Sequence, residues 1–166
     1  MKLSEGDAAD ADDVWYRIIT DKKYLRADGR LRSSAFTGKA IAPPRGKRDW
    51  NHELSGRLLS LAGDVSSHAK AFCVANSKLF VGVMHSQVDK LRFEIGAVTS
   101  DVRYTPRPDD EAHADFVTYN STEDDLPDIR DRLQEIVRVL NPTELNKLEA
   151  KRQTSDASPQ PESAAD

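Results

Sequence analysis

The sequence has little of what marks secreted, membrane-spanning or disulfide-stabilised proteins. Its single cysteine, Cys73, excludes an internal disulfide bond, and its apolar neighbours predict that the thiol is buried and inert. The longest apolar run covers residues 79–84, far short of the roughly 20 residues that a membrane-spanning helix needs. Residues 1–7 are acidic and have no apolar segment typical of a signal peptide. We therefore expect a cytoplasmic protein with no membrane partner.

Short catalytic and cofactor motifs are also missing. There is no Gly-rich phosphate loop, no Gly-x-Ser-x-Gly elbow and no His-Glu-x-x-His pair. The four histidines lie far apart, so the sequence lacks the close ligand pairs of a structural zinc site. We therefore predict no metal and no cofactor. The sequence leaves open whether the protein is an enzyme, although the lack of a diagnostic motif favours a non-enzymatic role.

Length and composition indicate one globular domain between two tails. The chain has 166 residues, of which 38% are hydrophobic and 31% are charged, and this is enough for one ordinary domain. The two ends are polar, rich in Ala, Asp and Glu at the start and in Pro, Ser and Ala at the finish, so they bury too little apolar surface to offset their ordering entropy. We predict a disordered acidic tail at 1–13, a single globular domain at 14–150 and a disordered tail at 151–166.

The hydrophobic pattern predicts an α+β fold. Strands are expected where β-branched residues run together or alternate with polar ones. These segments are Val14–Ile19, Lys78–Met84, Val98–Tyr104 and His113–Tyr119, with residues 30–36 as an edge strand or an ordered loop. Helices are expected where apolar residues recur at helical spacing. These segments run from Asp49 or Asn51 to Leu61, over 86–95, from Leu126 to Leu140 and from Asn141 through Leu148. We predict a mixed α/β sandwich in which helices, including a C-terminal amphipathic helix, pack on a sheet of four or five strands.

Charge is distributed unevenly along the chain. The net charge is −4, yet residues 14–60 hold eleven basic residues against four acids, and residues 105–135 hold ten acids against three basic residues. One interpretation is that the two segments face each other in the fold or cover opposite surfaces. The other is that residues 14–60 form a basic surface that binds an anionic partner, either nucleic acid or an acidic protein.

Eight residues of this basic segment are candidates for binding an anion. Arg17 interrupts an apolar strand, and a buried guanidinium needs either an internal acid or a ligand as its partner. The others place cations and hydroxyl groups after a Gly turn or in a Pro-rich loop. The full set is Arg17, Arg30, Arg32, Ser33, Ser34, Arg45, Lys47 and Arg48. Three aromatic residues between these cations, Tyr24, Phe36 and Trp50, would allow stacking on single-stranded nucleic acid.

His113 is the candidate catalytic residue. It lies between two alanines, whose small side chains leave its ring accessible, and several nearby aspartates are placed to orient it. Beside an anion clamp of arginine and serine it would act as an acid or a base on a nucleotide or another phosphorylated substrate. The alternative interpretation is a structural histidine that bonds a loop carbonyl.

Two stretches, Asp28–Phe36 and Pro106–Ala114, resemble known sequences. The first reads Asp-Gly-Arg and then Ser-Ser-Ala-Phe, and the second reads Pro-Arg-Pro-Asp-Asp-Glu-Ala-His-Ala. The chain thereby resembles a family of small bacterial proteins of unknown function with an Asp-Gly-Arg stretch, a Ser-x-Ala-Phe-like stretch and a later Pro-x-Pro-Asp-x-x-Ala-His-Ala stretch. The resemblance implies a bacterial origin and marks two loops, and it brings no established activity.

Three functions are compatible with the sequence. The first is a bacterial accessory or interaction module that uses residues 14–60 to bind an anionic partner. The second is a small enzyme acting on a nucleotide or phosphorylated substrate through an Arg/Ser clamp and His113. The third is a structural subunit of a larger complex that docks through the apolar stripe from Ile129 to Leu140, although such a stripe is typical of a core-facing helix.

Overall fold

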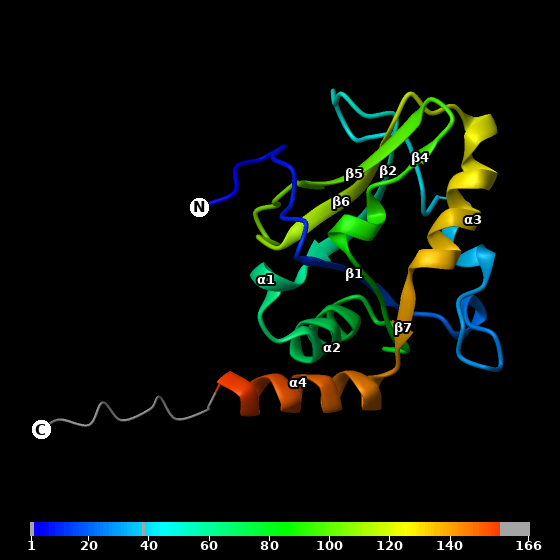
Figure 1. Cartoon of the computed structure of the whole chain (residues 1–166). Helices are drawn as coiled ribbons and strands as arrows, with labels where there is room; N and C mark the ends of the chain where they lie inside the picture. The colour runs from blue at the N-terminus through cyan, green and yellow to red at the C-terminus, as the bar shows by residue number, and fades with distance from the viewer. Residues whose placement is uncertain (1, 38, 157–166) are drawn as a thin grey trace, which may run out of the picture.

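The protein folds around one curled antiparallel sheet, which Figure 1 shows. The computed structural model describes residues 2–37 and 39–156. In these residues seven strands follow the order β4-β5-β6-β2-β1-β3-β7 and curl into a half-barrel. The strands are β1 (Val14–Ile19), β2 (His52–Leu58), β3 (Gly82–Gln87), β4 (Glu94–Ile95), β5 (Val98–Tyr104), β6 (His113–Tyr119) and β7 (Arg138–Leu140). The predicted sheet of four or five strands is wrong, because β2, β4 and β7 are strands that the hydrophobic pattern does not indicate.

Four α-helices and four 3-10 turns of the described chain connect these strands. The helices are α1 (Leu59–Ala62), α2 (Val65–Ala75), α3 (Leu126–Ile136) and α4 (Pro142–Asp156). The turns are η1 (Lys22–Tyr24), η2 (Ser33–Phe36), η3 (Val88–Leu91) and η4 (Glu123–Asp125). Sequence reasoning missed α2. Its start is nevertheless marked by Asp64, whose side chain accepts a hydrogen bond from the backbone N–H of Ser67, as an N-cap residue does.

The central strand β2 replaces a predicted helix. Leu54, Leu58 and Leu61 recur at intervals of four and three, which fits one face of a helix. An interval of four also places Leu54 and Leu58 on one face of a strand. Buried and half-buried residues alternate along β2, and Leu61 lies beyond the strand with 46% of its surface exposed. Pairing with β1 on one side and β6 on the other therefore decides in favour of the extended chain.

Two further segments also contain strands where the pattern predicts only helix. Within residues 86–95, β3 extends to Gln87, η3 forms a single turn and β4 follows, so this segment contains no α-helix. Further along the chain, α3 ends at Ile136, and residues 138–140 form β7, which pairs with β3. In both segments, backbone pairing with another strand overrides the local helical spacing of the apolar residues.

Other predictions of local structure are confirmed. The strands β1, β5 and β6 have the predicted bounds. The helix expected after Asn141 begins at Pro142 and continues to Asp156. Residues 151–156 of the expected C-terminal tail therefore belong to α4, and the remainder of that tail, 157–166, lies outside the described residues.

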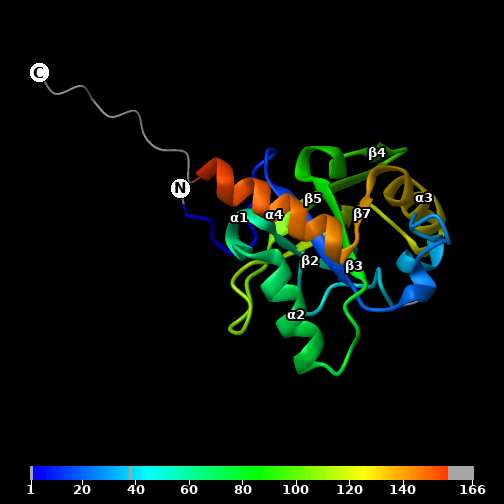
Figure 2. The ribbon, with the colours of Figure 1, turned by 90° about the horizontal axis from the view of Figure 1, so that it is seen from below.

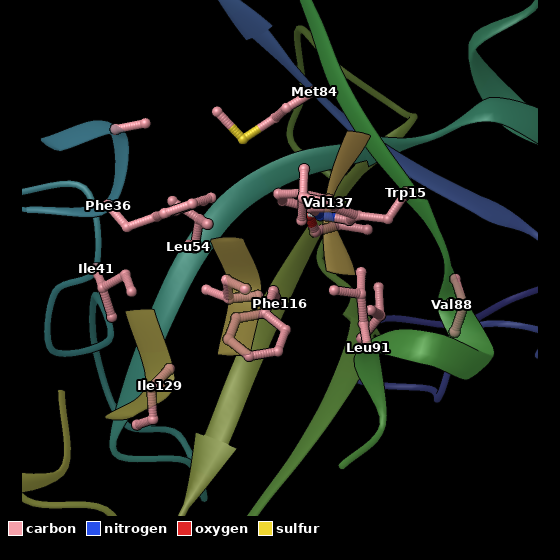
Figure 3. Close-up of a cluster of buried hydrophobic side chains, with 14 of the residues drawn as sticks. Trp15, Phe36, Ile41, Leu54, Met84, Val88, Leu91, Phe116, Ile129 and Val137 are labelled. Atoms are coloured by element: carbon pink, nitrogen blue, oxygen red, sulfur yellow. Dashed lines mark hydrogen bonds between the residues drawn. The ribbon is translucent and has the colours of Figure 1, made fainter. Parts of the chain in front are cut away.

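Two apolar clusters lie on opposite faces of the sheet. The larger cluster packs beneath α3 and η2, and Figure 3 shows several of its members, among them Trp15, Phe36, Leu54, Phe116 and Ile129. The smaller cluster lies between the sheet and the helices α2 and α4, and it contains Tyr16, Val83, Ala69 and Leu145. Figure 1 shows these two helices beneath the sheet, and in Figure 2, which is seen from below, they lie in front of it. Both faces of the sheet are therefore covered.

Residues 6–9 belong to the acidic segment that composition predicts to be a tail, and they lie along the edge of β5 (Figure 1). Backbone hydrogen bonds of 2.7 and 2.9 Å join Gly6 and Ala9 to β5, and Ala9 is buried in the larger cluster. The same placement brings Glu5 beside the loop that precedes β2.

Candidate functional site

A polar cleft of about 130 Å³ lies over the central strands of the sheet. Side chains from β2 and β6 line it together with the loop before β2 and the loop between β5 and β6. The lining residues are Arg45, Arg48, Glu53, Thr105, Pro106, Arg107, His113 and Asp115. The basic segment 14–60 and the acidic segment 105–135 therefore meet at this cleft.

Strand register sets the arrangement of polar side chains here. Tyr16, Arg57 and His113 lie opposite one another across β1, β2 and β6, so they form one row on the face that packs against α2. Asp115 lies two residues further along β6 and shares that face. The hydroxyl oxygen of Tyr16 lies 3.0 Å from Nδ1 of His68 on α2. Burial raises the pKa of Tyr16 above its ordinary value, so the hydroxyl keeps its proton.

A buried ion pair borders this row. Arg57 Nε lies 2.7 Å from Asp110 Oδ2, and the two side chains are only 14% and 10% exposed. The guanidinium of Arg57 also lies over the ring of Phe72, 5.3 Å from its centre. This pair links the basic segment to the acidic segment, and it neutralises one cation of residues 14–60 inside the fold.

His113 is held by its neighbours rather than presented to solvent. Its residue is 3% exposed, and Nδ1 lies 2.9 Å from the backbone oxygen of Thr105. A carbonyl oxygen only accepts, so Nδ1 carries the proton and Nε2 keeps a lone pair. Nε2 makes no hydrogen bond in the described structure and faces Asp115 Oδ1 at 3.8 Å. Burial lowers the pKa of His113, which favours the neutral ring.

Asp115 is tied to the same group through its other oxygen. Oδ2 accepts a hydrogen bond of 2.9 Å from the hydroxyl of Thr105, and the residue is 4% exposed. Thr105 thus contacts both His113 and Asp115. The arrangement matches the structural interpretation of His113, a ring that bonds a loop carbonyl, and its Nε2 is not exposed to a substrate.

The arginines of the cleft differ in how they are paired. Arg48 forms an ion pair of 2.6 Å with Glu5 and lies over the ring of Trp50. Arg45 and Arg107 form no ion pair with the carboxylates of residues 2–37 and 39–151. Glu53 lines the cleft too, but its carboxylate accepts a hydrogen bond of 2.8 Å from the indole N–H of Trp50. Arg45 and Arg107 are therefore the cations available to an anion.

The remaining candidates lie elsewhere. Arg17 Nη1 donates a hydrogen bond of 2.7 Å to the backbone oxygen of Ser55, so a carbonyl occupies the place expected for an internal acid or a ligand. Burial lowers the pKa of Arg17. Arg32 donates to the backbone oxygen of Leu25, and Arg30 pairs with Asp28.

The expected clamp of arginine and serine is not assembled beside His113. Ser33 and Ser34 form part of η2, next to α3 on the other face of the sheet. Lys47 is exposed on the loop before β2 and does not line the cleft. Of the eight predicted anion-binding residues, only Arg45 and Arg48 share the cleft with His113.

Sequence reasoning missed three residues that shape this site, Arg57, Thr105 and Arg107, whereas Asp115 was among the aspartates expected to orient His113. Arg107 and Thr105 stand in the loop already marked by its two prolines, which was the available signal. Arg57 and Asp115 face the same side because of strand register, and register depends on β2 being a strand. No local pattern reveals that pairing.

Among the side chains of residues 2–37 and 39–151, no three His, Cys, Asp or Glu groups are placed so that they would bind a metal ion. None of the described helices combines the length and the apolar character needed to cross a membrane.

Comparison with protein-family models, with curated proteins and with solved structures finds no significant match for this chain.

Proposed function

We propose that this protein is an accessory interaction module that binds nucleic acid through phosphate contacts at the Arg45–Arg107 cleft. The observation that supports this is the convergence of two arginines from distant loops on one cleft. Neither guanidinium forms an ion pair within the described chain, although the backbone N–H of Arg45 donates a hydrogen bond to the Glu53 carboxylate. Guanidinium groups bind phosphate oxygens through paired N–H donors, and unpaired ones lose no internal partner when they do so.

The loop before β2 extends this binding surface. Residues 43–49 are mostly exposed and carry Arg45, Lys47 and Arg48 within four positions. Closely spaced cations on one exposed loop match the repeated charges of a nucleic acid backbone better than they match a single carboxylate.

Two aromatic residues of the basic segment, Phe36 and Trp50, are not placed to stack on bases. Phe36 is fully buried in the larger apolar cluster, and Trp50 is 6% exposed beneath Arg48. Contacts to the backbone are therefore expected to dominate, with little dependence on base sequence.

The first test is fluorescence anisotropy with a labelled oligo-dT strand and a labelled DNA duplex over a range of salt concentrations. Phosphate contacts from Arg45, Lys47 and Arg107 predict a slope of log K against log salt of about −2 to −3. The variant Arg45→Gln/Arg107→Gln is expected to bind roughly tenfold more weakly per arginine removed, because a charged hydrogen bond contributes about 1.5 kcal/mol.

The matched control is Arg30→Gln/Arg32→Gln, which removes the same charge from residues outside the cleft. It should bind like the unchanged protein, and circular dichroism should show that both variants fold. Equal weakening by both double variants would show that binding depends on overall charge and not on the cleft, which would contradict the proposed site. Salt-independent binding, or preferential binding of a glutamate-rich peptide, would contradict a nucleic acid partner.

A further inference from the structure

A second cavity, of about 290 Å³, lies between α4 and the sheet, away from the arginine cleft. The two share no lining residue. The walls are the faces of β1, β3 and β7 on one side and α4 on the other, and single residues from α1, α2, α3 and η3 also line the cavity. A largely apolar cavity of this size, with a few polar groups, is typical of a small-molecule site.

Strand register orders the lining into rows. Val14 lies opposite Gln87, and Tyr16 lies opposite His85, which in turn lies opposite Arg138 of β7. The next row along the same face pairs Val83 with Leu140. Apart from Val14, polar side chains therefore occupy the first two rows, and apolar side chains occupy the third.

Residues outside the sheet reinforce this division. Lys90, on η3, stands next to the first row, because η3 directly follows β3. Leu145 of α4 and Val65 of α2 belong to the apolar cluster that includes Val83. The cavity thus has a polar end and an apolar end.

The polar end has a surplus of positive charge. Lys90 forms no ion pair with any carboxylate of the described chain. Arg138 donates from Nη1 to the backbone oxygen of Glu135, which leaves its charge uncompensated. The acid that lines the cavity, Glu149, accepts a hydrogen bond from the backbone N–H of Ser66 at the start of α2. A ligand that meets Lys90 and Arg138 is therefore favoured if it carries negative charge.

We propose that this cavity binds a small amphipathic anion with one carboxylate and a hydrocarbon body. The carboxylate lies toward Lys90, Gln87 and His85, and the hydrocarbon lies over Val83, Leu140 and Leu145. Leu148 of α4 also lines the cavity and is 44% exposed, so a bound hydrocarbon would cover apolar surface that now faces solvent. This binding site is independent of the arginine cleft.

The test uses isothermal titration calorimetry of the full chain with decanoate, decanol and decylamine. Decanoate is expected to bind more tightly than decanol, and decylamine should bind most weakly. Affinity should rise by about fourfold per methylene from hexanoate to decanoate, the increment expected for burial of one CH₂ group. Resonances of the His85 ring in an NMR titration should shift with decanoate, which locates the ligand.

Variants separate this site from unspecific adsorption. Lys90→Gln should weaken decanoate binding by roughly tenfold, the loss of one charge-assisted contact, and leave decanol binding unchanged. The matched control, Lys70→Gln, alters an exposed lysine of α2 outside the cavity and should leave both unchanged. Decylamine binding as tight as decanoate, unchanged His85 resonances, or equal effects of the two lysine variants would each overturn the proposal. None of these results would bear on the arginine cleft.

Discussion

At the scale of single residues, Gly56 has less room for a side chain than the other described glycines, because Trp15 packs against it. The indole of Trp15 crosses over Gly56 on the neighbouring strand, and its N–H donates a hydrogen bond of 3.1 Å to the backbone oxygen of Ala114 on β6. A Cβ atom at position 56 would lie 2.2 Å from the indole ring. One tryptophan thus spans three strands, which requires that β2 carry no side chain at this point.

Gly56→Ala is therefore expected to destabilise the protein by about 3 kcal/mol, because the buried indole has no room to move aside. Equilibrium unfolding in urea measures this. The control Gly96→Ala has open space around the new methyl group and carries only the cost of its positive φ, about 1 kcal/mol. Equal costs for the two variants would show that the indole yields to the new methyl group.

Residue-scale reasoning from sequence had a mixed outcome at the site. The pattern singled out Arg17 as a cation that needs a partner within an apolar strand. The residue is half-buried, and its partner is a carbonyl oxygen of β2. The small neighbours of His113 predicted an accessible ring, whereas the ring is covered because Thr105 and Asp115 pack against it. Neighbours in space, rather than neighbours in sequence, determine exposure.

At the scale of elements, local signals were reliable where side chains contact their own backbone. The start of α4 is an example. The Asn141 side-chain oxygen accepts a hydrogen bond of 2.8 Å from the Glu144 backbone N–H. The Glu144 carboxylate in turn accepts hydrogen bonds from the backbone N–H and the side-chain NH₂ of Asn141. This reciprocal arrangement is encoded within four residues, so the helix start is predictable.

Asn141→Ala should lower the stability of this helix by about 1 kcal/mol, since it removes the N-cap. Hydrogen exchange is the appropriate measurement, and amides of residues 144–148 should exchange several-fold faster. Thr143→Ala, at an exposed position of the same turn, is the control and should change exchange little. Protection that is the same in both variants would mean that contacts with the sheet, rather than the cap, hold the first turn.

At the scale of the whole molecule, three histidines link stability to pH. Burial is the main cause that lowers the pKa of His68, His85 and His113. The unfolded chain, whose histidines have a pKa near 6.5, therefore binds more protons than the folded protein in mildly acidic solution. This contribution to stability is complete above about pH 6.5 and decreases as pH falls.

Guanidinium unfolding at pH 7.5 and pH 5.5 should accordingly show lower stability at the lower pH, by at most about 1.4 kcal/mol per histidine and pH unit. His85→Gln should make the pH dependence shallower. Identical stability of the unchanged protein at the two pH values would contradict the lowered pKa of these rings.

The distribution of charge is also a property of the whole molecule. Within the described chain, the basic and acidic segments are joined by one ion pair, Arg57–Asp110, whereas Arg48 pairs with the N-terminal segment. The sequence showed that the two segments carry opposite charge. Their spatial relation depends on loops that come together only when β2 and β6 pair.

The sequence by itself determined the elements whose pattern has one interpretation: the apolar strand β1, the alternating strand β5, its partner β6 and the capped start of α4. The tertiary structure alone decided that residues 52–58 are a central strand, that α3 ends before residue 138, and which arginines meet at the cleft. The physical reason is the range of the interactions. Capping and alternation act between near neighbours, whereas strand pairing and ion pairing join residues far apart in the chain, and their energies appear only once the sheet has closed.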